Sequence, residues 1–118
     1  MSNGGMIAQA IGCNLPDKVD AIINIAGMQA LGMSCVPKQP VTMVIYGAKN
    51  DTTVPPEDIL AADGYFYEPM ANTVDDWKNA FNCNNSSKKE ISNPAEVTVE
   101  HFFECDDNVT VTSYLDHN

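Results

Sequence analysis

Arginine is absent from this 118-residue sequence, and all six basic residues are lysines. Sixteen acidic residues outnumber them, so the net charge is −10 at pH 7. Such a surface repels phosphate groups, which excludes nucleic acid and anionic membranes as partners. No apolar run approaches the ~20 residues that a bilayer span requires. The first residues also lack a basic segment followed by an apolar one, so no signal peptide is predicted.

Metal-binding and cofactor-binding motifs are also missing. No two cysteines have C-x-x-C spacing, and neither His101 nor His117 follows a cysteine at the spacing of a zinc finger. Zinc is therefore not expected. The sequence contains no phosphate-binding loop and no paired carboxylates of the glycosidase kind. We expect a protein that needs no cofactor and holds no metal.

The cysteine count is even, at four: Cys13, Cys35, Cys83 and Cys105. An even number in an acidic, loop-rich chain favours disulfides and an oxidising compartment, which predicts a secreted protein. Three pairings are formally open, and sequence spacing does not choose among them. The alternative is that some of the four are buried free thiols.

Hydrophobic periodicity predicts alternating helices and strands, the pattern of an α/β protein. Thr73 is the expected N-cap of the second long helix, with Asp75 and Asp76 in its first turn. The expected helices span 3–14, 57–62 and 73–81, the expected strands span 20–26, 41–46, 97–103 and 109–115, and 82–94 is expected to be a polar loop.

The first five residues, Met1-Ser2-Asn3-Gly4-Gly5, are the most informative segment. A serine followed by small residues and then by a helix is typical of the exit of a nucleophile elbow, G-x-S-x-G. The small residues let the helix pass close to a strand while the serine hydroxyl stays exposed. The alternative interpretation is that Ser2 is an ordinary helix N-cap.

Five segments in the same order resemble the esterase and polyhydroxybutyrate-depolymerase group of α/β-hydrolases, which includes feruloyl and acetylxylan esterases. Ser2-Asn3-Gly4-Gly5-Met6 is similar to that family's G-x-S-N-G-G-M elbow without its first glycine. The other segments are Leu15-Pro16-Asp17, then Cys35-Val36-Pro37 with Pro40-Val41, then Tyr46-Gly47 through Asp51 to Val54-Pro55, and last Trp77 with Asn82-Cys83 and Cys105. Together they cover nearly the whole chain.

The resemblance implies a partial α/β-hydrolase fold, with a mostly parallel sheet and flanking helices, over a single domain at 1–118. It implies the C-terminal part of an enzyme, truncated at the N-terminus and at the C-terminus. The implied activity is that of a serine esterase, acting on acyl esters of polysaccharides or on short polyesters, with little or no turnover from this chain alone. Sheet edges exposed by truncation would favour a homo-oligomer.

The resemblance also implies site residues. Ser2 is the implied nucleophile, the backbone N–H of Asn3 is one oxyanion donor, and Asp51 is the acid that orients a histidine. His117 is the candidate base in this chain, and a histidine just beyond residue 118 is the alternative, because the family's G-H-x-W-P motif is missing. Tyr46 stands where the family has a histidine. The implied disulfide joins Cys83 to Cys105, which leaves Cys13 and Cys35 as the second pair.

A second hypothesis comes from another class of protein. An acidic, disulfide-bonded secreted domain without catalytic activity, which binds a partner, has the same composition. This hypothesis requires Met1 to be the native start of the protein.

Overall fold

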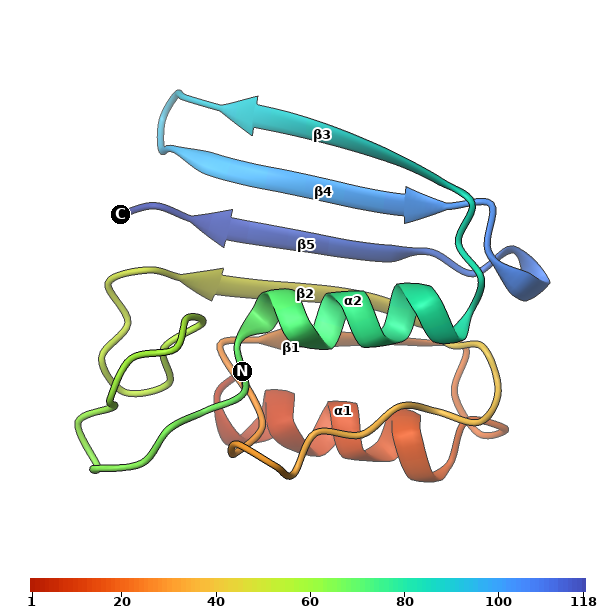
Figure 1. The fold of residues 1–118 in the computed structure, drawn as a ribbon, viewed down its shortest axis with the longest axis horizontal. Helices are drawn as coiled ribbons and strands as arrows, with labels where there is room; N and C mark the ends of the chain where they lie inside the picture. The colour runs from red at the N-terminus through yellow and green to blue at the C-terminus, as the bar shows by residue number, and fades with distance from the viewer.

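Two helices and five strands make up the fold in the computed structural model, which describes residues 1–118 (Figure 1). The two helices, one 3₁₀ turn and five strands are, in chain order, α1 (Asn3–Asn14), β1 (Ala21–Ile25), β2 (Thr42–Ala48), α2 (Met70–Ala80), β3 (Asn85–Ile91), β4 (Val97–Phe103), a 3₁₀ turn (Asp106–Asn108) and β5 (Val111–Asp116). The five strands form one sheet in the order β1-β2-β5-β4-β3. The helix expected at 3–14 and the strand expected at 97–103 have these bounds in the structure.

The sheet is mixed, so the expected partial α/β-hydrolase fold with a mostly parallel sheet is wrong. β1 runs parallel to β2, and β2 runs parallel to β5. The other two pairs, β5 with β4 and β4 with β3, are antiparallel. Two of the four strand pairings are therefore parallel, and only two short helices accompany the sheet.

Short connections explain the antiparallel half of the sheet. The segment 85–91, expected to belong to a polar loop, forms β3 and pairs along its whole length with β4. Only residues 92–96 separate the two strands. A parallel pairing requires a crossover of about a dozen residues or more, so a connection this short enforces a hairpin.

Both helices pack on the same face of the sheet, here called the helical face. A Cβ at Gly12 of α1 would lie 3.1 Å from Ile22 of β1 and 3.6 Å from Trp77 of α2, so the two helices meet above β1. Ile22 pairs in register with Met43 of β2, which places both side chains on that face. The buried core lies between this face and the helices, and its members include Ile22, Met43, Ile45, Val74, Trp77, Phe81 and Val111.

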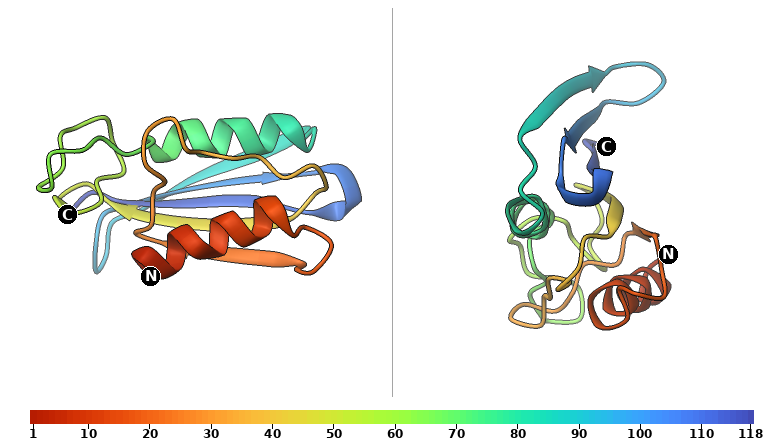
Figure 2. Two further views of the ribbon diagram at one scale, coloured as in Figure 1. Left: turned by 90° about the horizontal axis from the view of Figure 1, so that it is seen from below. Right: turned by 90° about the vertical axis from the view of Figure 1, so that its right-hand side faces the viewer.

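The opposite face, here called the open face, carries no helix (Figure 2). Ile23 is 61% exposed and Ile25 is 39% exposed, because alternate residues of β1 point to opposite faces. Their register partners on β2 are Val44 and Tyr46, which are partly exposed. The sheet therefore buries one face and leaves apolar side chains on the other.

Two helix predictions differ from the structure. Residues 57–62 form an irregular loop rather than a helix, and in it the Ala62 N–H donates to the Thr52 carbonyl. The second long helix begins at Met70, three residues before its expected start, with Pro69 at the N-cap. Thr73 is therefore a buried residue inside α2 and not its cap. Proline fits a helix start because its missing N–H has no intrahelical acceptor there.

Two disulfides link helices to loops and strands. Cys13 at the end of α1 is bonded to Cys35 in the loop between β1 and β2, and Cys83 after α2 is bonded to Cys105 after β4. No cysteine is free. The prediction that the chain contains disulfides is confirmed, and the pairs are those that the resemblance implied.

Candidate functional site

The predicted catalytic residues lie along one edge of the sheet. Strands β1, β2 and β5 run parallel, so their carboxyl ends meet at the same edge. Ser2 is hydrogen-bonded to the end of β1, Asp51 follows β2, and His117 follows β5. Both chain termini lie on this side of the molecule (Figures 1 and 2). The carboxyl edge of parallel strands is the usual place for a site in a sheet of this kind.

Ser2 has a strained backbone. Its φ of 52° and ψ of −122° lie outside the regions that L-residues populate readily. The Ser2 N–H donates to the Ile25 carbonyl at 2.8 Å, and the Ser2 carbonyl accepts from the Met6 N–H at 3.1 Å. These two hydrogen bonds hold Ser2 in a sharp bend, between the carboxyl end of β1 and the first turn of α1. Strain of this kind costs about 1–3 kcal/mol, and it is concentrated at functional sites.

Two glycines allow the first turn of α1 to lie directly on the end of β1. A Cβ at Gly27 would lie 2.5 Å from the Ser2 carbonyl oxygen and 2.7 Å from the Met6 nitrogen. A Cβ at Gly5 would collide with the side chain of Asn24. Only glycine fits at these two positions, which is why the serine bend can form so close to the strand.

The Ser2 hydroxyl makes no hydrogen bond within the chain. Ser2 stands at the N-cap position of α1, yet its side chain makes no capping hydrogen bond, contrary to the N-cap alternative. The residue is partly exposed. The next residue, Asn3, begins the helix, so its N–H has no intrahelical acceptor and carries part of the positive end of the helix dipole. An N–H of this kind can stabilise an oxyanion formed at Ser2.

Asp51 forms the turn that follows β2. Its Oδ1 accepts hydrogen bonds from the backbone N–H groups of Thr53 at 2.9 Å and Val54 at 3.0 Å. These bonds fix the orientation of the carboxylate, and its Oδ2 makes no hydrogen bond within the chain. Asp51 is therefore a turn-forming residue, with one oxygen left for a histidine.

The His117 ring is hydrogen-bonded to the antiparallel half of the sheet. Its Nε2 lies 2.6 Å from Thr98 Oγ1, and Thr98 Oγ1 donates to Glu90 Oε2, also at 2.6 Å. A hydroxyl has one proton, so His117 Nε2 must be the donor to Thr98. The ring thus contacts β4 and lines a shallow hollow with Glu90 and Glu96. His117 forms no hydrogen bond with Asp51 or Ser2, so the structure does not assemble the three residues into a triad.

A hydrogen-bonded pair at the same edge was not predicted from the sequence. The hydroxyl of Tyr46 on β2 donates to Asp116 Oδ2 on β5 at 2.9 Å. This hydrogen bond, with burial and the charge of Asp116, raises the pKa of Tyr46. Hydrogen bonds from the Asn118 backbone N–H and then from Tyr46 lower the pKa of Asp116. The signal in the sequence is that both residues lie near the carboxyl ends of strands that pair in parallel, but it requires knowing the pairing.

The Tyr46–Asp116 pair gives a test by titration. Asp116→Asn is expected to move the pKa of Tyr46 down toward its usual value of about 10, because the negative acceptor is removed. Since the folded state raises this pKa, the stabilisation is complete below pH 10 or so and is lost as the pH rises through the folded value. The measurement is an NMR titration of the tyrosine ring signals.

Asp63→Asn is the matched control for this titration. Asp63 accepts from the Tyr67 hydroxyl at 2.6 Å, a bond that raises the pKa of Tyr67. The control should lower the pKa of Tyr67 and leave that of Tyr46 unchanged. An unchanged pKa of Tyr46 in Asp116→Asn would contradict the assigned hydrogen bond.

Other side chains add no metal centre to this edge. No group of three histidine, cysteine or acidic residues is placed to hold a metal ion. His101 is bonded through Nδ1 to Thr112 Oγ1 at 2.7 Å and stacks on Phe103. Neither helix has the length and apolarity that a bilayer crossing requires.

Comparisons with protein-family models, with curated proteins and with solved structures find no match to this chain.

Proposed function

We propose that the chain carries the nucleophile of a serine carboxylic-ester hydrolase, with Ser2 as the attacking residue. The single observation that carries the proposal is the backbone of Ser2. A serine held at φ 52° and ψ −122°, with an uncapped hydroxyl at a helix N-terminus, is the arrangement that a nucleophile elbow needs. A structural N-cap requires neither the strain nor the free hydroxyl.

The chemistry follows from these groups. Ser2 Oγ attacks the carbonyl carbon of an ester, and a base takes its proton. The negative oxygen of the tetrahedral intermediate accepts a hydrogen bond from the Asn3 N–H at the positive end of α1. The alcohol leaves with a proton, and water then hydrolyses the acyl-serine. The proposed substrates are acyl esters of polysaccharides or short polyesters, and the reaction needs no cofactor.

No general base is hydrogen-bonded to the Ser2 hydroxyl in this chain. His117 donates to Thr98 and has no bond to Asp51. To act, its ring would have to leave Thr98, or a histidine outside this chain would have to take its place. We therefore expect Ser2 in this chain to react slowly with esters, because a positioned general base contributes about 100- to 10,000-fold.

A fluorophosphonate reagent tests Ser2 directly. The reagent transfers a phosphonyl group to a nucleophilic serine, and tandem mass spectrometry identifies the modified residue. We expect labelling at Ser2, none at this position in Ser2→Ala, and about tenfold faster labelling when free imidazole replaces the absent base.

Ser87→Ala is the control for this experiment. Ser87 lies exposed on β3, away from any helix N-terminus, so its removal should leave the labelling unchanged. Labelling that survives Ser2→Ala, or that is no faster at Ser2 than at Ser87, would show that Ser2 is not a nucleophile.

A non-catalytic binding domain is the second candidate function. The engagement of His117 with Thr98 and Glu90 favours it, because no triad is assembled. The two disulfides suit either candidate, and in both cases we propose a secreted protein. Absence of any labelling at Ser2, with and without imidazole, would favour this second function.

A further inference from the structure

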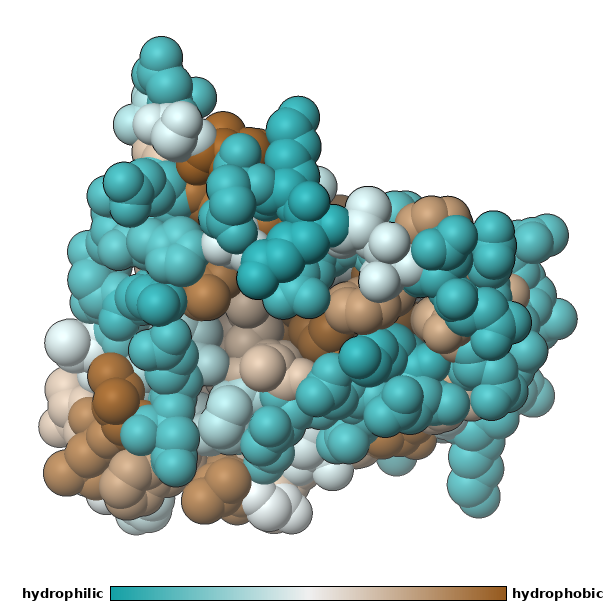
Figure 3. All heavy atoms as spheres, turned by 45° about the horizontal axis from the view of Figure 1, so that its top comes forward, coloured by the Kyte–Doolittle hydropathy of each residue, from teal (hydrophilic) through white to brown (hydrophobic).

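A pocket of about 380 Å³ lies on the helical face, away from Ser2. It opens between α2 and the hairpin of β3 and β4, because α2 covers β2 and β5 and no helix covers the hairpin. Apolar atoms line part of the hollow, and polar surfaces surround it (Figure 3). This volume falls within the range of small-molecule sites, about 300–1,000 Å³.

The floor of the pocket holds a hydroxyl that is open to the cavity and has no partner in the chain. Ser113 on β5 is 6% exposed and lines the pocket, and its side chain makes no hydrogen bond within the chain. A hydroxyl that faces a cavity without a partner in the chain is available to a ligand or to water there.

A carboxylate that forms no ion pair lies beside this hydroxyl. Glu100 on β4 is directly opposite Ser113 in the antiparallel register, and both side chains line the pocket. Directly opposite residues have Cβ atoms about 4.5–5.5 Å apart, so one ligand atom can reach both groups. Glu100 is partly buried and takes part in none of the three ion pairs of the chain.

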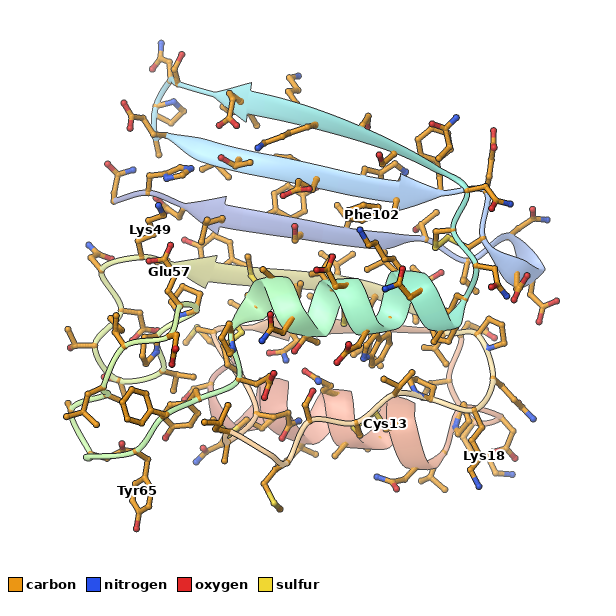
Figure 4. All side chains as sticks on the ribbon, viewed as in Figure 1. Cys13, Lys18, Lys49, Glu57, Tyr65 and Phe102 are labelled. Carbon is orange, nitrogen blue, oxygen red and sulfur yellow. A yellow bond between two sulfur atoms is a disulfide. The ribbon has the colours of Figure 1, made fainter.

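Lys78 lines the pocket and is already paired, and Lys88 is directly opposite Glu100 on β3 but forms no ion pair with it. Lys78 lies 3.1 Å from Asp75 and 4.7 Å from the centre of the Phe102 ring, while Lys49 lies 3.4 Å from Glu57 (Figure 4). None of these lysines forms an ion pair with Glu100. The apolar part of the lining comes from Met70, Val74, Phe102 and Leu115.

We propose that this pocket binds a small organic cation, a primary ammonium group on an apolar body. The ammonium donates to the Glu100 carboxylate and to Ser113 Oγ, and the apolar body lies against the walls. The net charge of −10 favours a cation over an anion at this site. The proposal is independent of any role for Ser2.

Three probes of similar shape and different charge test the site. They are 2-phenylethylamine, which is protonated at pH 7, neutral 2-phenylethanol and anionic 3-phenylpropionate. We expect the amine to shift the backbone amide signals of the pocket strands in an NMR titration, with a dissociation constant of about 1 mM. The alcohol should bind about tenfold more weakly, because it lacks a charge-assisted hydrogen bond. The anion should not bind.

Variants of the floor residues complete the test. Glu100→Gln keeps the shape and removes the charge, and we expect it to weaken amine binding about tenfold. Ser113→Ala should weaken it about threefold, since one neutral hydrogen bond is lost. The control is Glu104→Gln, which removes one charge from an exposed position outside the pocket and should change the affinity less than twofold.

The amide spectrum of each variant reports whether it is folded, and Ser113→Ala provides an independent measurement if Glu100→Gln is not. Equal affinity for amine and alcohol, shifts that lie outside the pocket, or no shift with the amine at about 10 mM would overturn the proposal.

Discussion

Replacing Trp77 with alanine is expected to lower the free energy of unfolding by about 3–5 kcal/mol. Trp77 has no exposed surface, lies against Gly12 of α1 and makes an edge-to-face contact with Phe81. Its indole Nε1–H donates to the Cys35 carbonyl at 3.0 Å. One side chain thus connects α2, α1 and the loop after β1, and its removal opens a cavity where they meet. Urea unfolding followed by far-UV circular dichroism measures the change.

Tyr65→Ala is the matched control. Tyr65 is 69% exposed and points away from the body of the molecule at the tip of a loop (Figure 4). Its truncation should change the free energy of unfolding by less than about 0.5 kcal/mol. If Trp77→Ala cost less than about 1 kcal/mol, the described contact between the two helices would be wrong.

Removal of either disulfide is expected to cost about 3 kcal/mol. Both bonds join cysteines separated by 22 residues, so the chain-entropy model gives the same loss for each. The double variants Cys13→Ala/Cys35→Ala and Cys83→Ala/Cys105→Ala, compared by urea unfolding, measure the two losses.

A difference between the two variants would report on the folded state. Cys105 belongs to the buried core, while Cys13 and Cys35 are only partly buried. Alanine at Cys105 therefore leaves more unfilled space, and we expect the Cys83–Cys105 variant to be the less stable of the two. A loss below about 1 kcal/mol for both would contradict the role assigned to these bonds.

Local pattern was sufficient where the side chains themselves specify the structure. The alternating run Val97–Phe103 predicted β4 to the residue, because its β-branched and aromatic side chains suit a pleated surface. The helix at 3–14 was predicted equally well from its apolar spacing.

Pairing with a neighbour determined the elements that local pattern missed. β3 has the polar sequence Asn-Ser-Ser-Lys-Lys-Glu-Ile, and six of its seven residues are exposed. Nothing in it indicates a strand, and it is one because β4 offers an edge of hydrogen-bonding groups. The mostly parallel sheet was wrong for this reason, since the hairpin sets the direction of half the sheet.

The candidate site also has one part that the local sequence predicts and one part that it does not. The motif Ser2-Asn3-Gly4-Gly5 predicts a tight bend, and a hydrogen bond to the Ile25 carbonyl completes it. The orientation of His117 depends on Thr98 and Glu90, about 20 and 30 residues away in sequence, and no local pattern predicts it. The catalytic roles of Ser2, Asn3, Asp51 and His117 stay predictions until Ser2 is tested with the reagent described above.

The border of the sheet at β3 has a consequence for self-association. Lys88 and Lys89 are consecutive on this outermost strand, so one ammonium group projects from each face of the border. An incoming β-strand from another molecule would have to bring its own side chains against both charges while they lose water. The two charges therefore oppose strand addition at this border, even though its backbone groups are unpaired.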